Sequence, residues 1–321
     1  MVRKKTFKIG GAEVKKNGVD RYSEYPLKLL DFKKRKASKL HKEAQQLGDE
    51  EKFDEAIQKY LEAIECDPEK SGNYYNIGLI YKYRGEWQKS FEFNQKANEL
   101  DPEDEAARWN LAIAATALRN WTVARKKWEE NGITLEGSEG SIEMDFGLTP
   151  VRLNPDENGE VVWATRIDPV RARIDNIPFP ESGFRHGDMV LHDGAAVGYR
   201  KRGEDEYPVF NVLELFSPSP FTTNVATVSV ESESDMDALE KAFSATQSHY
   251  EDWTRNVRTL CRACSEGRPH EQHDHELKDE WFPERRLGIA VYPGDDIYRI
   301  LEQWQKNSSG RVLSVDPEIP R

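Results

Sequence analysis

The chain has 321 residues, about twice the length of a typical domain, so its length predicts two domains and excludes a single small module. Its 8 Trp, 12 Tyr and 13 Phe exclude a disordered chain, and its three cysteines are too few for a secreted disulfide framework. The formal charge of −12 argues against general nucleic-acid binding, because duplex affinity comes mainly from Lys and Arg.

The first 36 residues are basic, with 12 Lys or Arg against 4 Asp or Glu, whereas residues 37–138 and 139–321 carry net charges of −6 and −14. We expect residues 1–36 to form a solvated leader that folds back on the acidic body, with RNA binding through this leader as the alternative. The N-terminus lacks an apolar signal segment, and no segment approaches the ~20 apolar residues of a membrane span. We therefore expect a cytoplasmic protein.

A repeat with a spacing of 34 residues runs through residues 37–138. One aromatic position recurs twice, as Phe53, Trp87 and Trp121. Within each unit, two apolar patterns of helical period are separated by a short polar turn, which predicts a helical hairpin. Small residues would let neighbouring helices approach closely, as at Gly78. The register predicts three hairpins, at 37–70, 71–104 and 105–138.

These units resemble tetratricopeptide repeats (TPRs). The second unit is the clearest match, with Tyr74, Ile77, Gly78, Tyr81, Gly85, Ala97 and Pro102 at the characteristic positions. The third unit departs from the pattern, because Arg119 stands where the family has its turn glycine. The resemblance implies stacked hairpins whose first helices line a concave groove for an extended or helical peptide.

Mapping that groove onto this sequence selects ten residues: His41, Gln45, Tyr75, Asn76, Leu79, Lys82, Tyr83, Trp109, Asn110 and Ile113. Members of the family that bind the acidic C-terminal tails of chaperones use a clamp of Lys, Arg and Asn, of which only Asn76 is matched here. Aromatic and amide side chains favour a ligand with apolar side chains and backbone amides, so we expect a protein or peptide partner in the groove. The alternative is that the chain's own leader or second domain covers these aromatics.

The second half begins after a segment rich in Gly, Ser and Glu, in which we predict a linker at residues 139–146. From residue 147 the apolar period changes to two. Six short runs separated by turn signals predict a small antiparallel β-barrel or sandwich. Asp193-Gly194 is the sharpest of these signals and predicts a two-residue hairpin turn.

Beyond Pro220, predicted strands alternate with predicted helices. We expect helices in DMDALEKAFSAT, SHYEDWTRNVRTLCRAC and GDDIYRILEQWQ, and strands in NVATVSV, RRLGIAVY and GRVLSV. This alternation predicts a strand-helix layer with a ferredoxin-like arrangement. The expected fold is therefore multidomain, an all-α TPR array followed by an α+β domain over residues 147–321, and we identify no family for residues 139–321.

Two cysteines and three histidines fall within 15 residues, as Cys261-x2-Cys264-x5-His270-x2-His273-x-His275. Thiolates and imidazoles suit Zn²⁺ in a tetrahedral site, and cysteines three residues apart share one face of a helix. We predict a structural zinc site with Cys261, Cys264, His273 and His275 as ligands, in an insertion around residues 261–275. A solvated loop with half-buried thiols and a redox-active cysteine pair are the alternatives.

Zinc chemistry also supplies an alternative function, a zinc-dependent hydrolase whose repeats recruit substrate. Glu271, Asp274 or Glu276 would then serve as acid or base. The sequence contains no phosphate-binding Walker loop, no dinucleotide fingerprint and no G-x-S-x-G elbow. Enzyme function therefore has little support, and a non-enzymatic adaptor is the first hypothesis.

His186 and His192 are close in sequence to Asp188 and Asp193, so the two histidines could be interpreted as an acid–base pair. The aspartates lie in turn signals and His192 in an alternating strand, so we interpret all four as turn and surface residues. The adaptor would use its acidic surface to favour a basic partner, in a chaperone-like or immunity-type role.

Overall fold

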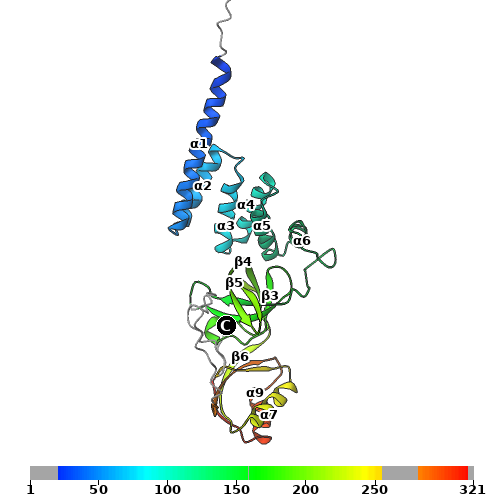
Figure 1. Cartoon of the computed structure of the whole chain (residues 1–321). Helices are drawn as coiled ribbons and strands as arrows, with labels where there is room; N and C mark the ends of the chain where they lie inside the picture. Colours follow the sequence, from blue (N-terminus) through cyan, green and yellow to red (C-terminus); the bar gives the residue numbers. More distant parts are fainter. Residues whose placement is uncertain (1–20, 158, 255–280, 317–321) are drawn as a thin grey trace, which may run out of the picture. The chain divides into compact units, whose positions relative to one another are not determined.

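The computed structural model describes residues 21–157, 159–254 and 281–316, and for residues 21–30 only the course of the helix. The chain divides into two compact units, with the boundary after Asn76. In Figure 1 the helices α1 to α6 are coloured blue to green, and the strand-rich part that follows runs from green to red. None of the helices in these ranges is long and apolar enough to cross a membrane.

The first unit contains α1 (Arg21–Asp49), α2 (Phe53–Cys66) and the first half of α3 (Ser71–Tyr83). α1 begins well before residue 37, so the prediction of a tail is wrong for residues 21–36. Leu, Lys and Arg, which are strong helix formers, predominate from Leu27 to Lys36, and Arg35 pairs with Asp31 one turn earlier at 2.9 Å. The basic side chains at residues 33–36 are exposed, as expected.

The second unit begins within α3 and continues with α4 (Trp87–Leu100), α5 (Glu105–Ala117) and α6 (Trp121–Glu130). Phe53, Trp87 and Trp121 are the first residues of α2, α4 and α6, so the 34-residue register marks the start of the second helix in each hairpin. Gly78 lies against Asn94, and a Cβ on Gly78 would come 2.5 Å from Asn94 Nδ2. The predicted close approach of helices at Gly78 is confirmed.

Residues 133–147 have no regular secondary structure, yet they are tightly bound to the rest of the second unit. Ile142 is fully buried in one core with Trp128 and the barrel residue Leu191. Backbone hydrogen bonds join Met144 N to the carbonyl oxygen of Ile167 at 2.9 Å. The segment therefore connects the helices rigidly to the strands that follow.

Five strands form a closed barrel in the order β1-β2-β3-β4-β5. They are β1 (Leu148–Leu153), β2 (Glu160–Arg166), β3 (Arg171–Ile174), β4 (Met189–Arg202) and β5 (Asp205–Ser217), with a short 3₁₀ helix at Pro180–Ser182. Sequential neighbours pair antiparallel, and a short parallel pairing of Val151 with Phe210 closes the barrel. Alternate residues such as Val162 and Val190 fill the interior. The predicted small barrel is confirmed.

The hairpin turn predicted at Asp193-Gly194 is wrong, because both residues lie within β4. The chain reverses instead after Arg202, where Gly203 has a φ of +64°. β4 bulges between His192 and Ala196, so that residues 193–195 lie opposite a single residue of β5. Glycine is required at position 194 by a close approach, since a Cβ there would come 1.9 Å from Trp109 Nε1.

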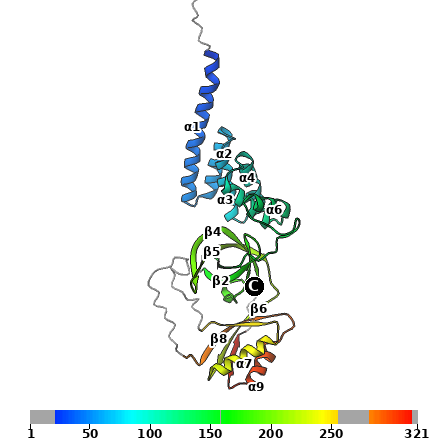
Figure 2. The same ribbon diagram turned by 45° about the vertical axis from the view of Figure 1, so that its right-hand side comes forward.

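A second sheet has the order β7-β8-β6-β9 with antiparallel neighbours. Its elements are β6 (Thr222–Ser229), α7 (Glu233–Ser244), β7 (His249–Asp252), β8 (Glu284–Val291), α9 (Ile297–Lys306) and β9 (Arg311–Asp316). Figures 1 and 2 show α7 and α9 on the same face of the sheet, where Trp304 and Leu239 are buried. The order of strands and helices is the predicted ferredoxin-like arrangement.

One helix predicted in this layer is wrong where the structure describes it. Residues 249–252 form strand β7 instead of the start of a helix, because they pair with β8 at the edge of the sheet, His249 opposite Ala290 and Tyr250 opposite Ile289. Tyr250 also packs on Phe243 of α7. The strand pairing joins residues about 40 positions apart in the sequence. It stabilises a strand here although the local sequence pattern has a helical period.

Candidate functional site

Four of the ten predicted groove residues belong to the first unit. Gln45 of α1 is exposed, and Tyr75 and Asn76 of α3 are half-buried. His41 donates from Nδ1 to Asn73 Oδ1 at 2.7 Å, and its ring packs edge-on against Tyr60 with 5.5 Å between centroids. Burial lowers the pKa of His41, so at neutral pH this face is polar and uncharged at its centre.

The other six residues belong to the second unit, and their exposure differs. Tyr83 is 60% exposed, whereas Lys82, Asn110 and Ile113 are buried. Leu79 and Trp109 are half-buried. The inner face of the third repeat is therefore mostly out of reach of a partner in this structure.

Asp193 of β4 covers this part of the face. Lys82 Nζ lies 3.0 Å from Asp193 Oδ1 and 3.1 Å from Oδ2, and it also donates to Asn110 Oδ1 at 3.3 Å. The side chains of Lys82 and Asp193 are 3% and 7% exposed. Burial lowers the pKa of Lys82, and the Asp193 carboxylate opposes this shift. Lys82 on the inner face thus binds a carboxylate supplied by the chain's own barrel, and the Asn110 side chain accepts a further hydrogen bond from Lys82.

Further contacts join the helices of the second unit to the barrel. Trp109 lies on Gly194, Trp87 donates from Nε1 to Glu214 at 2.6 Å, and Arg119 stacks over the Phe216 ring at 4.4 Å. The alternative that the second domain covers the groove aromatics therefore holds for Trp109. Sequence reasoning missed Asp193 and Glu214, because residues more than a hundred positions away give no local signal of such contacts.

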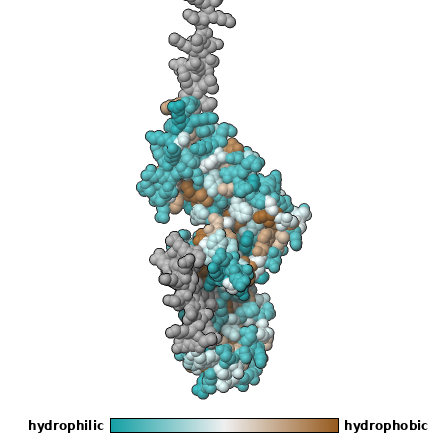
Figure 3. Space-filling view, in the orientation of Figure 1, coloured by the Kyte–Doolittle hydropathy of each residue, from teal (hydrophilic) through white to brown (hydrophobic). Residues whose placement is uncertain are grey.

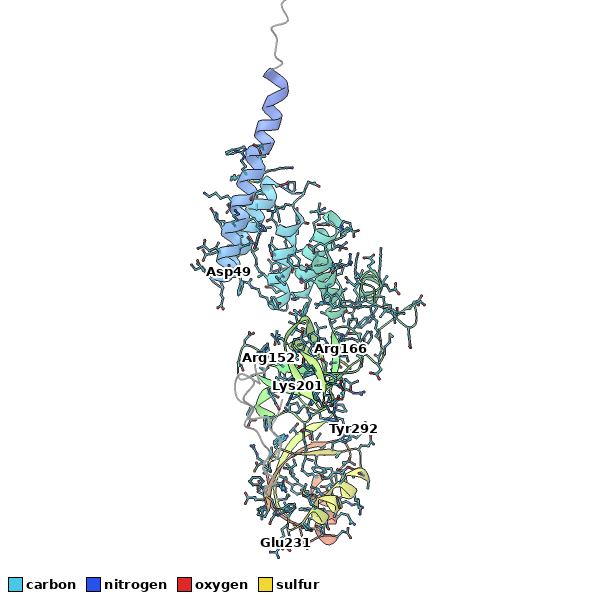
Figure 4. All side chains as sticks on the ribbon, viewed as in Figure 1. Asp49, Arg152, Arg166, Lys201, Glu231 and Tyr292 are labelled. Atoms are coloured by element: carbon cyan, nitrogen blue, oxygen red, sulfur yellow. The ribbon has the colours of Figure 1, made fainter. Side chains whose placement is uncertain are left out.

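The interpretation of His192, Asp188 and Asp193 as surface residues is wrong, since all three are buried. His192 points into the end of the barrel, stacks on Phe210 at 4.9 Å and donates from Nδ1 to the Asp193 carbonyl at 2.7 Å. Burial lowers the pKa of His192 to about 4, with a smaller contribution from Arg166. Figure 4 labels Arg166 on this barrel. His192 thus lies on the face of β4 that is buried. The alternating pattern predicted a strand but did not show which of its two faces would be buried.

His186 lies apart from His192, at the junction of the barrel and the second sheet. Its ring is 4.8 Å from that of His249 and 4.8 Å from that of Phe221. Burial and then the neighbouring His249 lower the pKa of His186. The two histidines singled out in the sequence thus do not form one acid–base pair.

The predicted zinc ligands Cys261, Cys264, His273 and His275 lie outside the described residues, so their site stays a prediction. Glu271, Asp274 and Glu276 lie there as well. Among the residues that the structure describes, no group of three or more His, Cys, Asp or Glu could hold a metal ion.

Comparisons with known proteins concern the helical region. No protein-family model matches the chain. Photosystem I assembly protein Ycf3 of Cyanophora paradoxa is 33% identical over 92 residues, which cover 27% of this chain and 53% of that protein. Tetratricopeptide repeat protein 6 of Homo sapiens is 34% identical over 64 residues, 20% of this chain and 12% of that protein. The chain thus spans about half or less of the length of these curated relatives.

Similar solved structures include the second TPR domain of Spaghetti (RPAP3) bound to an HSP90 peptide, with a TM-score of 0.33, 18% identity and coverage of 34% of this chain and 95% of that one. The TPR2B domain of yeast Sti1 in complex with Hsp70 has a TM-score of 0.29, 22% identity and coverage of 30% and 77%. The conclusion rests on the 34-residue register, on the helices that begin on it and on the two curated relatives. The N-terminal helical region of this chain is TPR-like, and its C-terminal half is unassigned.

Proposed function

We propose that this chain is a protein-interaction adaptor that binds a peptide segment of its partner on the inner face formed by α1 and the first part of α3. The observation that carries the proposal is the difference in exposure along the predicted groove. Gln45, Tyr75 and Asn76 retain accessible surface, whereas Lys82, Asn110 and Ile113 are buried.

The chemistry of the accessible face indicates what it would bind. Tyr75 supplies apolar area, and the amides of Gln45 and Asn76 can exchange hydrogen bonds with a peptide backbone. Burial lowers the pKa of His41, so its neutral ring does not supply one of the cations that would bind an acidic tail. A peptide with apolar side chains fits this face better than a carboxylate tail does.

The charge of the whole chain suggests the electrostatic character of the partner. A formal charge of −12 would speed encounter with a basic protein, in a chaperone-like or immunity-type role. A structural zinc bound by Cys261, Cys264, His273 and His275 remains part of the proposal on the sequence pattern alone. No described residue favours the hydrolase alternative.

Two experiments in sequence test the proposal. Affinity capture with the full chain identifies a partner, and the affinity of the full chain for that purified partner is then measured. The variant Gln45→Ala/Tyr75→Ala should weaken that binding at least about tenfold. Tyr298→Ala is the matched control, because Tyr298 is an exposed tyrosine on α9. Trp109→Ala is unsuitable, since it would disturb the packing on Gly194. Equal binding by the groove variant and the control contradicts the proposal.

A further inference from the structure

A cleft of about 620 Å³ lies beside the start of α6, outside the inner face of the repeats. Its walls are Arg119 and Asn120, one side of α6 from Trp121 to Glu129, and residues 138–140 of the irregular segment that follows. The volume is in the range of small-molecule and side-chain binding sites. Figure 3 shows that the surface of the molecule on the face drawn is mostly hydrophilic, with hydrophobic residues in small separate patches.

Arg125 forms part of the cleft wall and is only 7% exposed. It donates four hydrogen bonds to carbonyl oxygens, from Nε to Gly140, from Nη1 to Glu136 and Gly137, and from Nη2 to Ser141, at 2.8–3.1 Å. Positive φ values at Gly137 and Gly140, +68° and +71°, allow the segment to curl around the guanidinium. The hydrogen bonds of the buried Arg125 side chain thus fix the position of residues 136–141, which include residues 138–140 of the cleft wall.

The charge of Arg125 is not neutralised by an acid. Within the described ranges no carboxylate lies within ion-pair distance of it, and its four partners are neutral carbonyls. A buried cation without a counter-ion raises the local potential, because dipoles offset the cost of burial without removing the charge. An anion in the cleft would supply the missing negative charge.

Two further cations line the same cleft. Lys126 is exposed, with its nearest carboxylate, Glu130, at 4.0 Å. Arg119 is also exposed, and one of its nitrogens bonds the Phe216 carbonyl at 2.9 Å, which holds the guanidinium in place over the ring. Glu129 and Glu139, also lining residues, are exposed. Three cations against two carboxylates contrast with the acidic excess of the chain as a whole.

We propose that this cleft binds a phosphate group, with Arg119 and Lys126 contacting its oxygens and Arg125 adding charge from the wall. A phosphate monoester carries close to two negative charges at neutral pH and three acceptor oxygens, which match several cations better than a single carboxylate does. The Trp121 indole, which also lines the cleft, packs against the organic part of the ligand. The phosphate comes either from a small molecule or from a phosphorylated protein segment.

Calorimetric titration of the full chain at constant ionic strength tests the inference. The probes are inorganic phosphate, O-phosphoserine, a short phosphoserine peptide and the same peptide without phosphate. We expect binding of the phosphorylated probes and none of the unphosphorylated peptide. Tighter binding of the phosphopeptide than of O-phosphoserine identifies a protein segment as the source, and equal binding identifies a small molecule.

The variant Arg119→Asn/Lys126→Gln should weaken phosphate binding at least about tenfold. Asparagine is chosen because residue 119 has a φ of +56°, which asparagine tolerates. Lys126→Glu provides a second variant that changes only an exposed side chain, and Lys96→Gln on α4 is the control. No binding at ~10 mM phosphate, or equal affinity in the cleft variants and the control, overturns the inference.

Discussion

The ammonium group of Lys82 lies 3.0 Å from the carboxylate of Asp193, and the two residues are separated by 111 positions in the sequence. Lys82 lies in the last turn of α3, an inner helix of the TPR-like array, and Asp193 projects from the bulge of β4. A bulge re-aims side chains, and here it turns Asp193 toward the helices while its neighbour His192 points into the barrel. The pair joins the repeats to the barrel.

Removing either partner of this pair should strongly destabilise the second unit. Lys82→Met leaves a buried carboxylate without its cation, and Asp193→Asn leaves a buried ammonium, each at a cost of about 3–5 kcal/mol. Because the double variant leaves no buried charge, it should lose clearly less than the sum of the two. Urea unfolding of all four proteins gives the coupling free energy. Additive losses would show that the two charges do not interact.

Gly194→Ala should destabilise the contact of the barrel with α5. The new Cβ would come 1.9 Å from Trp109 Nε1, so the indole or the strand must move, at a cost of about 1–3 kcal/mol. The melting temperature measures the loss. Adding Trp109→Leu should recover part of it, since the smaller side chain leaves room for the methyl group. Gly48→Ala in α1 is the control, because no atom lies within 4 Å of a Cβ at that position and Gly48 does not have a positive φ.

The stability of the barrel should fall in acid because of His192. Burial lowers its pKa from an ordinary 6.5 to about 4, so between these values the unfolded chain binds the proton and the folded chain does not. The free energy of unfolding therefore decreases as the pH falls from about 6.5 to about 4, by on the order of 3 kcal/mol at ~1.4 kcal/mol per pKa unit.

His192→Gln checks this assignment, since it keeps a polar side chain that does not titrate. Unfolding free energies at several pH values between 4 and 7 should give a flatter profile for the variant than for the parent chain. His41→Gln, in the first unit, should leave the pH profile of the second unit unchanged. An identical slope in the His192 variant would mean that another group causes the acid sensitivity.

Zinc binding follows from the cysteine and histidine spacing alone. The purified chain should contain about one zinc ion, measured by elemental analysis, and Cys261→Ser/Cys264→Ser should lose it because serine does not supply a thiolate ligand. Cys66→Ser is the control, since Cys66 lies in α2. A parent chain free of zinc after metal-replete expression would contradict the prediction, as would full zinc content in the double variant.

The amino-acid sequence by itself determined the local elements. The 34-residue period placed the second helix of every hairpin at Phe53, Trp87 and Trp121, and alternating residues predicted the barrel strands, because backbone geometry imposes these periods on any buried face. The alternation of strands and helices after Pro220 also predicted the ferredoxin-like layer, although the strand β7 was predicted as the start of a helix. The accessible residues of the proposed groove, Gln45, Tyr75 and Asn76, were selected by the resemblance to tetratricopeptide repeats and not by periodicity alone.

Only the tertiary structure decided which of these residues are accessible. Asp193-Gly194 has the local chemistry of a turn, but the Trp109 indole and the Lys82 ammonium hold it in a strand. His249 has a helical neighbourhood in sequence, but pairing with β8 makes it part of a strand. Such contacts join residues far apart in the chain, and their free energies exceed local propensities of less than about 1 kcal/mol per residue. Local patterns therefore predict elements, whereas burial of Lys82, Asn110 and His192 depends on how distant elements pack.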